Sequence, residues 1–145
     1  PGTGDIQLTL SQKAQLAGAV IVTTPQDIAL QDARKGIEMF AKVDVPVLGV
    51  VENMALHTCS QCGHSESIFG ADGGERIARE YGVALIASLP LARGIREQTD
   101  SGAPTVVSDP DSAAAAAYLR AAEALAAGLA ARESADFPDI SVSDD

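Results

Sequence analysis

The 145 residues of this chain suffice for one compact domain, and two cysteines are too few for a secreted disulfide framework. Ten basic residues against twenty acidic ones give a formal charge of -10, which repels nucleic-acid phosphates and anionic membrane surfaces, so we expect neither as a partner. No apolar run approaches the roughly 20 residues of a membrane span, and we therefore expect a soluble, cytoplasmic protein.

The first part of the chain predicts a strand, a helix and a second strand. Residues 18–24 form a short β-branched apolar run, typical of a parallel strand that is buried on both faces. Residues 45–51 repeat this pattern. A helix near residues 28–43 is indicated between them by apolar residues at three- and four-residue steps, namely Leu30, Ala33, Ile37 and Phe40. The three elements have the span of a right-handed βαβ unit, about 30 residues.

The next part of the chain begins with a segment that lacks apolar periodicity. Residues 53–74 are rich in Cys, His, Ser and Gly, which predicts a functional loop. A short helix over residues 75–81 and a third buried strand over residues 83–89, ended by Pro90, are expected to follow. We expect a further short helical segment over residues 91–100.

The carboxy-terminal part predicts a long helix and a tail. Residues 112–132 are rich in Ala and Leu, the strongest helix formers. Residues 133–145 hold five acids and no base, which predicts a solvated, disordered tail. We therefore expect one α/β domain over residues 1–132, with a mostly parallel sheet between layers of helices. The chain opens with Pro-Gly-Thr-Gly-Asp and no Met, so we interpret it as a fragment that begins inside a domain.

Cys59 and Cys62 have the spacing of a metal knuckle, and Gly63 after them permits a tight turn. They supply two ligands, whereas a tetrahedral zinc ion or a cubane cluster takes four. The other two must come from a second copy or from elsewhere, and a two-fold dimer would bring four thiolates together at its axis. This arrangement predicts that both thiols face solvent or a dimer interface, on a mobile loop.

Three other interpretations of the cysteine pair stay open. The pair could be a redox dithiol, although such motifs usually open a helix after a strand. His57 and His64 flank the thiols and could complete a zinc site within one chain. The thiols could also be remnants of a dimer contact.

Two residues are candidates for nucleotide contacts. Gly2 would let a backbone N–H approach a terminal phosphate, although a turn-rich stretch of small residues is also an ordinary loop. Asn53 follows a buried strand, and its amide offers a donor and an acceptor to the edge of a base. A turn Asn with satisfied hydrogen bonds would look the same.

Taken together, these segments resemble the Mrp/ApbC iron-sulfur carriers, relatives of the MinD and ParA ATPases within the deviant P-loop class. The resemblance runs to about Arg132 and includes the pair Cys59 and Cys62. It rests further on the order and spacing of seven segments: PGTGDIQLTL (1–10), VTTPQD (22–27), DARKG (32–36), GVVENM (49–54), IFG (68–70), IRE (95–97) and GAP (102–104).

The resemblance implies the carboxy-terminal portion of a P-loop NTPase-like fold that carries iron-sulfur clusters. Cys59 and Cys62 would bind a 4Fe-4S cluster shared by a homodimer, which hands it to apo iron-sulfur proteins. Gly2 would lie in the switch segment that senses the γ-phosphate of ATP. Asn53 would contact the adenine, and the loop around Pro90 and Leu91 would close over the base.

The resemblance also implies a nucleotide site that this chain holds only in part. The family binds ATP and Mg²⁺ through a Gly-rich, Lys-containing loop, and this sequence contains no such loop. We therefore expect the chain alone to bind ATP poorly and to lack ATPase activity.

Two alternative functions use the same fold or the same thiols. A MinD/ParA-type positioning ATPase has no use for paired thiols, and the acidic tail lacks the basic amphipathic helix that membrane binding requires. A zinc-bridged dimer would use both thiols, and analysis of iron and sulfide would distinguish it from a cluster carrier.

Overall fold

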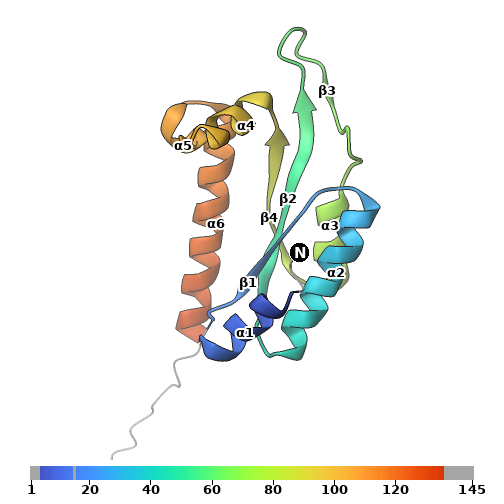
Figure 1. Ribbon diagram of the computed structural model, residues 1–145, viewed down its shortest axis with the longest axis vertical. Coiled ribbons are helices and arrows are strands. Elements are labelled where there is room, and N and C mark those ends of the chain that lie inside the picture. Colours follow the sequence, from blue (N-terminus) through green and yellow to red (C-terminus); the bar gives the residue numbers. More distant parts are fainter. Residues whose placement is uncertain (1–3, 15, 136–145) are drawn as a thin grey trace, which may run out of the picture.

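The computed structural model describes residues 4–14 and 16–135 (Figure 1). In chain order its elements are α1 (Asp5–Lys13), β1 (Ala19–Thr23), α2 (Asp27–Lys42), β2 (Val47–Thr58), β3 (Ser65–Glu66), α3 (Gly73–Tyr81), β4 (Ala84–Leu91), α4 (Arg93–Asp100), α5 (Thr105–Ser108) and α6 (Ala113–Ala135). Gly2 and residues 136–145 lie outside the described residues. Among the described helices, none combines the length and the apolar character that crossing a bilayer requires.

The sheet is built around β2, which is parallel to β1 along one edge and to β4 along the other. Val50 of β2 aligns with Ile21 of β1 and with Leu85 of β4. The short β3 is antiparallel to the far end of β2, where Glu66 aligns with His57. This mostly parallel sheet confirms the predicted α/β fold.

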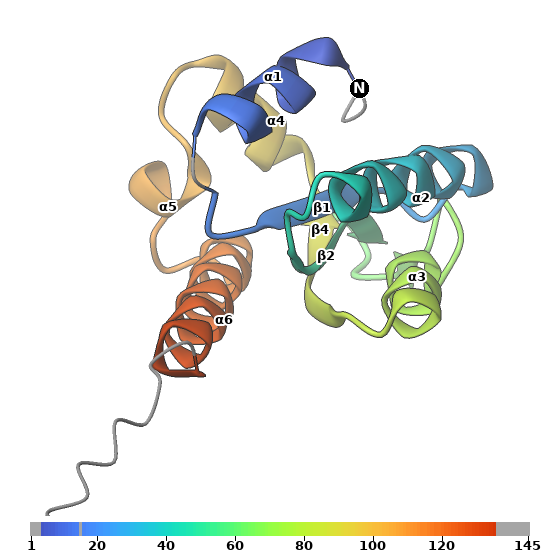
Figure 2. The ribbon, with the colours of Figure 1, turned by 90° about the horizontal axis from the view of Figure 1, so that it is seen from below.

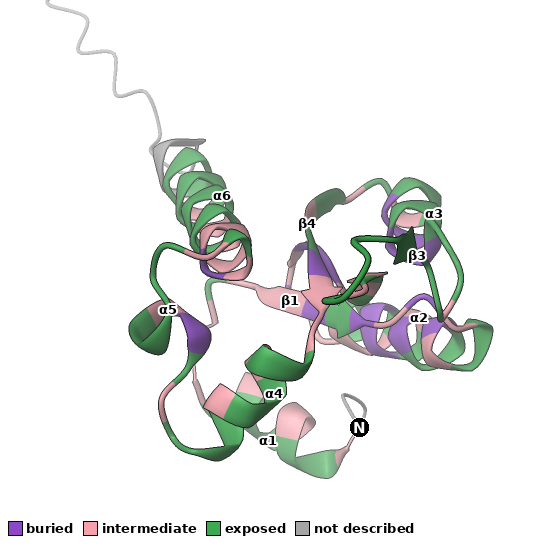
Figure 3. Cartoon of the chain, turned by 90° about the horizontal axis from the view of Figure 1, so that it is seen from above, coloured by how far each residue is buried: buried purple, intermediate pink, exposed green. Residues whose placement is uncertain are grey.

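Helices cover both faces of the sheet. Figure 2 shows α2 and α3 on one side of the strands and α6 on the other. The most deeply buried side chains are Leu30 of α2, Val50 of β2 and Ile77 of α3, and Figure 3 shows the buried residues concentrated on the sheet and the inner sides of these two helices. Each fully buried side chain of this kind stabilises the fold by about 1.5–3 kcal/mol. This core packs α2 and α3 against the middle of β1 and β2.

The predicted loop over residues 53–74 is wrong in its first part. β2 continues beyond Val51 to Thr58, because its far end has β3 along one edge and β4 along the other. Its side chains there alternate between exposed and half-buried, which is the period of a strand. The polar composition of the segment hides this alternation in the sequence.

Pro90 does not end β4, as the sequence predicted, because β4 continues to Leu91. Proline lacks an N–H and is tolerated in an edge strand, and β4 pairs only with β2 among the described strands.

Two helices were not predicted from the sequence. α1 buries no residue and therefore has no clear apolar stripe, and α5 has only four residues. The last helix extends through Ala135, so the first three residues of the predicted tail are helical.

Candidate functional site

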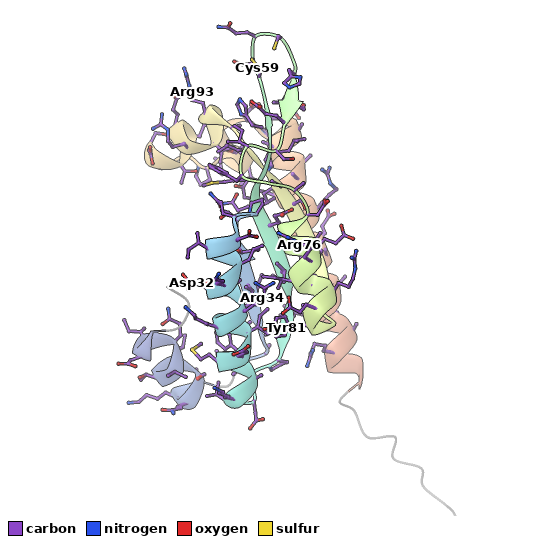
Figure 4. All side chains as sticks on the ribbon, turned by 90° about the vertical axis from the view of Figure 1, so that its right-hand side faces the viewer. Asp32, Arg34, Cys59, Arg76, Tyr81 and Arg93 are labelled. Atoms are coloured by element: carbon purple, nitrogen blue, oxygen red, sulfur yellow. The ribbon has the colours of Figure 1, made fainter. Side chains whose placement is uncertain are left out.

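The cysteine pair lies at the tip of a hairpin formed by β2 and β3, which projects beyond the sheet (Figures 1 and 4). The backbone N–H of Cys59 donates to the carbonyl oxygen of His64 at 2.9 Å, and the N–H of Gly63 donates to the carbonyl oxygen of Cys59 at 2.9 Å. Gly63 has φ of 72°, which a glycine adopts without strain. The hydroxyls of Thr58 and Ser65 are 2.8 Å apart across the hairpin. These bonds fold residues 59–64 into a closed turn.

The two cysteines are free. Cys59 is half-buried and Cys62 is exposed, as four-ligand assembly between two chains would require. Backbone hydrogen bonds from Cys62 and then Gln61, together with the Cys62 side chain, lower the pKa of the Cys59 thiol. A thiolate is the form that binds a metal ion, so the turn favours the ligating state of Cys59.

The structure does not support the alternative of a one-chain zinc site completed by His57 and His64. Within residues 4–14 and 16–135, no three or more His, Cys, Asp and Glu side chains come together in a group that could hold a metal ion. Nδ1 of His57 lies 3.2 Å from the carbonyl oxygen of Leu91. A carbonyl oxygen only accepts, so this nitrogen donates the hydrogen bond, and His57 belongs to the joint between β2 and β4. Within the described residues, the hairpin can therefore supply two ligands to a metal ion, the thiols of Cys59 and Cys62.

A bulge in β2 separates the hairpin from the body of the sheet. Glu52 aligns with Ser88 and Leu56 aligns with Pro90, so β2 has three residues, 53–55, where β4 has one. Met54 in the bulge has φ of 57°, a left-handed conformation that is strained for a non-glycine residue. Bulges are common beside functional sites because they redirect side chains.

A cavity of about 230 Å³ lies beside this bulge. Asn53, Pro90 and Leu91, the three predicted base contacts within the described residues, all line it. α4 and Tyr118 of α6 also contribute to its walls. Oδ1 of Asn53 accepts a hydrogen bond from the backbone N–H of Met54 at 2.9 Å, which fixes the side-chain amide. The structure thus brings together three residues that the sequence separates by up to 38 positions, from 53 to 91.

A second cavity, of about 530 Å³, runs along β1 and α2. Thr23, Thr24 and Asn53 line it together with Gln7 of α1. Asn53 therefore borders both cavities.

Glu52 is a positioning residue that the sequence analysis missed. Its side chain is 4% exposed and accepts hydrogen bonds from the backbone N–H of Gly74 at 2.9 Å and from the hydroxyl of Ser88 at 3.3 Å. It therefore ties the start of α3 and the strand β4 to β2, directly before the bulge. The sequence holds a signal for this role, since Glu52 is a charge at the end of the apolar run from residue 47 to 51.

Comparison with protein families identifies the group to which this architecture belongs. A family model described as NUBPL iron-transfer P-loop NTPase matches residues 1–126. The chain belongs to this family. An iron-sulfur cluster carrier protein from Pseudomonas fragi is 64% identical over 129 residues, which cover 89% of this chain and 45% of that protein. The resemblance to iron-sulfur carriers is therefore confirmed, and the chain spans less than half the length of that relative.

Solved structures agree with membership of the iron-transfer P-loop NTPases. A nucleotide-binding protein from Archaeoglobus fulgidus, in complex with ADP, is 39% identical with a TM-score of 0.61, over 70% of this chain and 42% of that one. The cell division ATPase MinD from Pyrococcus furiosus is 29% identical with a TM-score of 0.61, over 77% of this chain and 43% of that one. Both likenesses support the P-loop NTPase-like fold class.

Proposed function

We propose that this iron-transfer family member holds a 4Fe-4S cluster as cargo between two copies of the chain. Cys59 and Cys62 of each copy would supply the four thiolate ligands. The observation that carries the proposal is the CxxC turn at the tip of a projecting hairpin, where both thiols are free and Cys62 is exposed.

The shape of the chain suits a shared cluster. The hairpin extends past the ends of the other strands (Figure 1). The hairpin tips of two copies of the chain can therefore meet while their sheets stay apart. A cubane cluster takes four cysteines, and the described hairpin provides two. A two-fold axis through the cluster supplies the other two, because an isologous interface sets identical residues opposite each other.

Transfer to an apo iron-sulfur protein is a ligand exchange in this proposal. Each iron–sulfur bond to Cys59 or Cys62 is replaced by a bond to an acceptor thiolate. The acceptor thiols lose their protons and the released carrier thiolates take them up, so no electron is transferred. The exposure of Cys62 leaves room for the acceptor to approach the cluster.

We further propose that Asn53, Pro90 and Leu91 contact the adenine of a nucleotide. The Asn53 amide can bond the edge of a base, while Pro90 and Leu91 present apolar surface to its face. A cavity of about 230 Å³ lies below the roughly 300 Å³ at which pockets for drug-sized ligands begin, so it suits a base and not a whole nucleotide. The proposed Gly2 contact and the sites for Mg²⁺ and phosphates involve chain outside the described residues.

Anaerobic reconstitution with iron and sulfide tests the proposed cluster site. We expect the wild-type chain to bind both elements and the variant Cys59→Ala/Cys62→Ala to bind neither, with unchanged circular dichroism because tip thiols contribute little packing. Gln61→Ala is the matched control, since it alters the same turn and keeps both thiols. Equal iron content in the double variant would rule out these ligands. Zinc without sulfide would indicate the zinc-bridged dimer instead.

A further inference from the structure

The hairpin that carries the thiols is held to the sheet by few backbone contacts. Beyond the bulge, β2 aligns with β4 only at Leu56 and His57. On its other edge it aligns with β3 only at His57 and Thr58. Because the pairing with β4 is interrupted over residues 53–55, the hairpin does not continue the regular backbone pairing of the central sheet.

His57 adds a side-chain bond at this joint. Its ring is half-buried, and Nδ1 donates to the carbonyl oxygen of Leu91, the last residue of β4, at 3.2 Å. The bond lies two residues before Cys59, at the base of the turn. His64 on the other arm is exposed, and its side chain makes no hydrogen bond within the described residues.

We propose that His57 is a positioning residue that fixes the direction in which the hairpin presents Cys59 and Cys62. This inference rests on the proposed cluster site. A strand rises about 3.3 Å per residue, so Cys59 lies roughly 7 Å beyond His57, and a small rotation at the joint moves both thiols. The ligating atoms of a metal site must be positioned to within about 0.5 Å. Beyond the bulge only two residue pairs align β2 with β4, so we infer that the side-chain hydrogen bond of His57 is needed as well.

Three substitutions separate this role from simple packing. His57→Leu retains apolar volume and loses the donor. His57→Asn loses volume and keeps an N–H near the position of Nδ1, so it should restore the bond to Leu91. His64→Leu is the matched control on the other arm of the hairpin. His57→Ala replaces the Leu variant if thermal unfolding shows that His57→Leu does not fold.

The affinity for a metal ion is measured by anaerobic titration with Co²⁺ alone. The thiolate-to-cobalt charge-transfer absorption reports how much Co²⁺ is bound. Groups that orient ligands from outside the coordination shell typically change metal affinity by about 10- to 100-fold. We therefore expect His57→Leu to bind Co²⁺ about 10-fold more weakly, and His57→Asn and His64→Leu to stay within about 2-fold of wild type. Wild-type affinity in His57→Leu, or equal losses in the Leu and Asn variants, would overturn the proposal.

Hydrogen exchange supplies a readout that needs no metal. The backbone amides of residues 56–59 should exchange faster in His57→Leu than in wild type, and at the wild-type rate in His57→Asn and His64→Leu. If the wild-type chain bound no Co²⁺ through its thiols, the proposed function would fail while this comparison still decided the role of His57. Unchanged exchange in His57→Leu would contradict the proposal in either case.

Discussion

At the scale of single residues, the site depends on side chains whose partners lie far along the chain. Glu52 accepts from Gly74, 22 residues away, and His57 donates to Leu91, 34 residues away. No pattern within one segment predicts such pairs. Cys59 and Cys62 could be selected as candidate metal ligands because two thiols at the required spacing lie within one turn. Asn53 could be selected from its position after a buried strand, but only the fold shows that it lines one cavity with Pro90 and Leu91.

Glu52→Ala should destabilise the chain by about 1–3 kcal/mol, because it leaves the buried N–H of Gly74 without an acceptor. Glu123→Ala, an exposed site on α6, is the matched control and should stay within about 0.5 kcal/mol of wild type. Urea unfolding of both variants measures the difference. Equal stabilities would show that the Glu52 carboxylate does not hold α3 to the sheet.

Met54→Gly tests the strain in the bulge. Glycine adopts the left-handed conformation of Met54 freely, whereas a non-glycine residue there costs about 1–3 kcal/mol. Ala55→Gly next to it gains no such relief and carries the usual loss of about 0.5–1 kcal/mol. We expect the free energy of unfolding of Met54→Gly to exceed that of Ala55→Gly by about 1 kcal/mol, measured by thermal unfolding. A less stable Met54→Gly would mean that packing of the Met54 side chain outweighs the strain.

At the scale of elements, the strands and helices of the core could be predicted from apolar periodicity, whereas α1 and the four-residue α5 could not. β1, α2 and α3 follow the predicted patterns because each buries a face in the common core. The far end of β2 and all of α1 bury little, so their sequences lack the apolar stripe on which prediction depends.

Arg34 of α2 and Glu80 of α3 form an ion pair between elements, which predicts a pH dependence. Nη2 of Arg34 lies 2.9 Å from Oε2 of Glu80, and this partner lowers the pKa of the Glu80 carboxyl. Because the folded-state pKa is below the unfolded value, the pair stabilises the fold at pH above that unfolded value. Its contribution is lost as pH falls through the folded pKa.

Arg34→Gln should therefore raise the pKa of Glu80 toward its ordinary value of 4.5 and flatten the decline of stability in acid. Carboxyl-carbon NMR titration measures the first effect and thermal unfolding below pH 5 the second. Lys35→Gln removes a pair within α2 and is the control. An unchanged Glu80 titration in Arg34→Gln would show that the pair does not form in solution.

At the scale of the whole molecule, the sequence could predict the α/β fold and the family, because the motifs run through the matched residues 1–126. The formal charge of -10 disfavours binding to nucleic-acid phosphates and anionic membrane surfaces, and this stays a prediction. Dimer formation stays a prediction, since it rests on a pair of thiols where a 4Fe-4S cluster takes four cysteine ligands.

Measured ATP turnover tests whether the chain acts as an ATPase on its own. Phosphoryl transfer requires a loop, a Lys and a magnesium ligand that position the phosphates, and this sequence has no Gly-rich Lys-containing loop. We expect phosphate release by the purified chain to equal background, and activity to return when a segment with that loop is supplied on the same or a companion chain. Turnover above background that survives further purification would contradict this prediction.

The most direct test of the central claim is native mass spectrometry of the anaerobically reconstituted chain. The cluster carrier proposed here predicts a species with the mass of two chains and one 4Fe-4S cluster, absent from Cys59→Ala/Cys62→Ala and present in Gln61→Ala. A cluster bound to a single chain, a zinc-containing dimer without sulfide, or a cluster that persists in the double cysteine variant would contradict it.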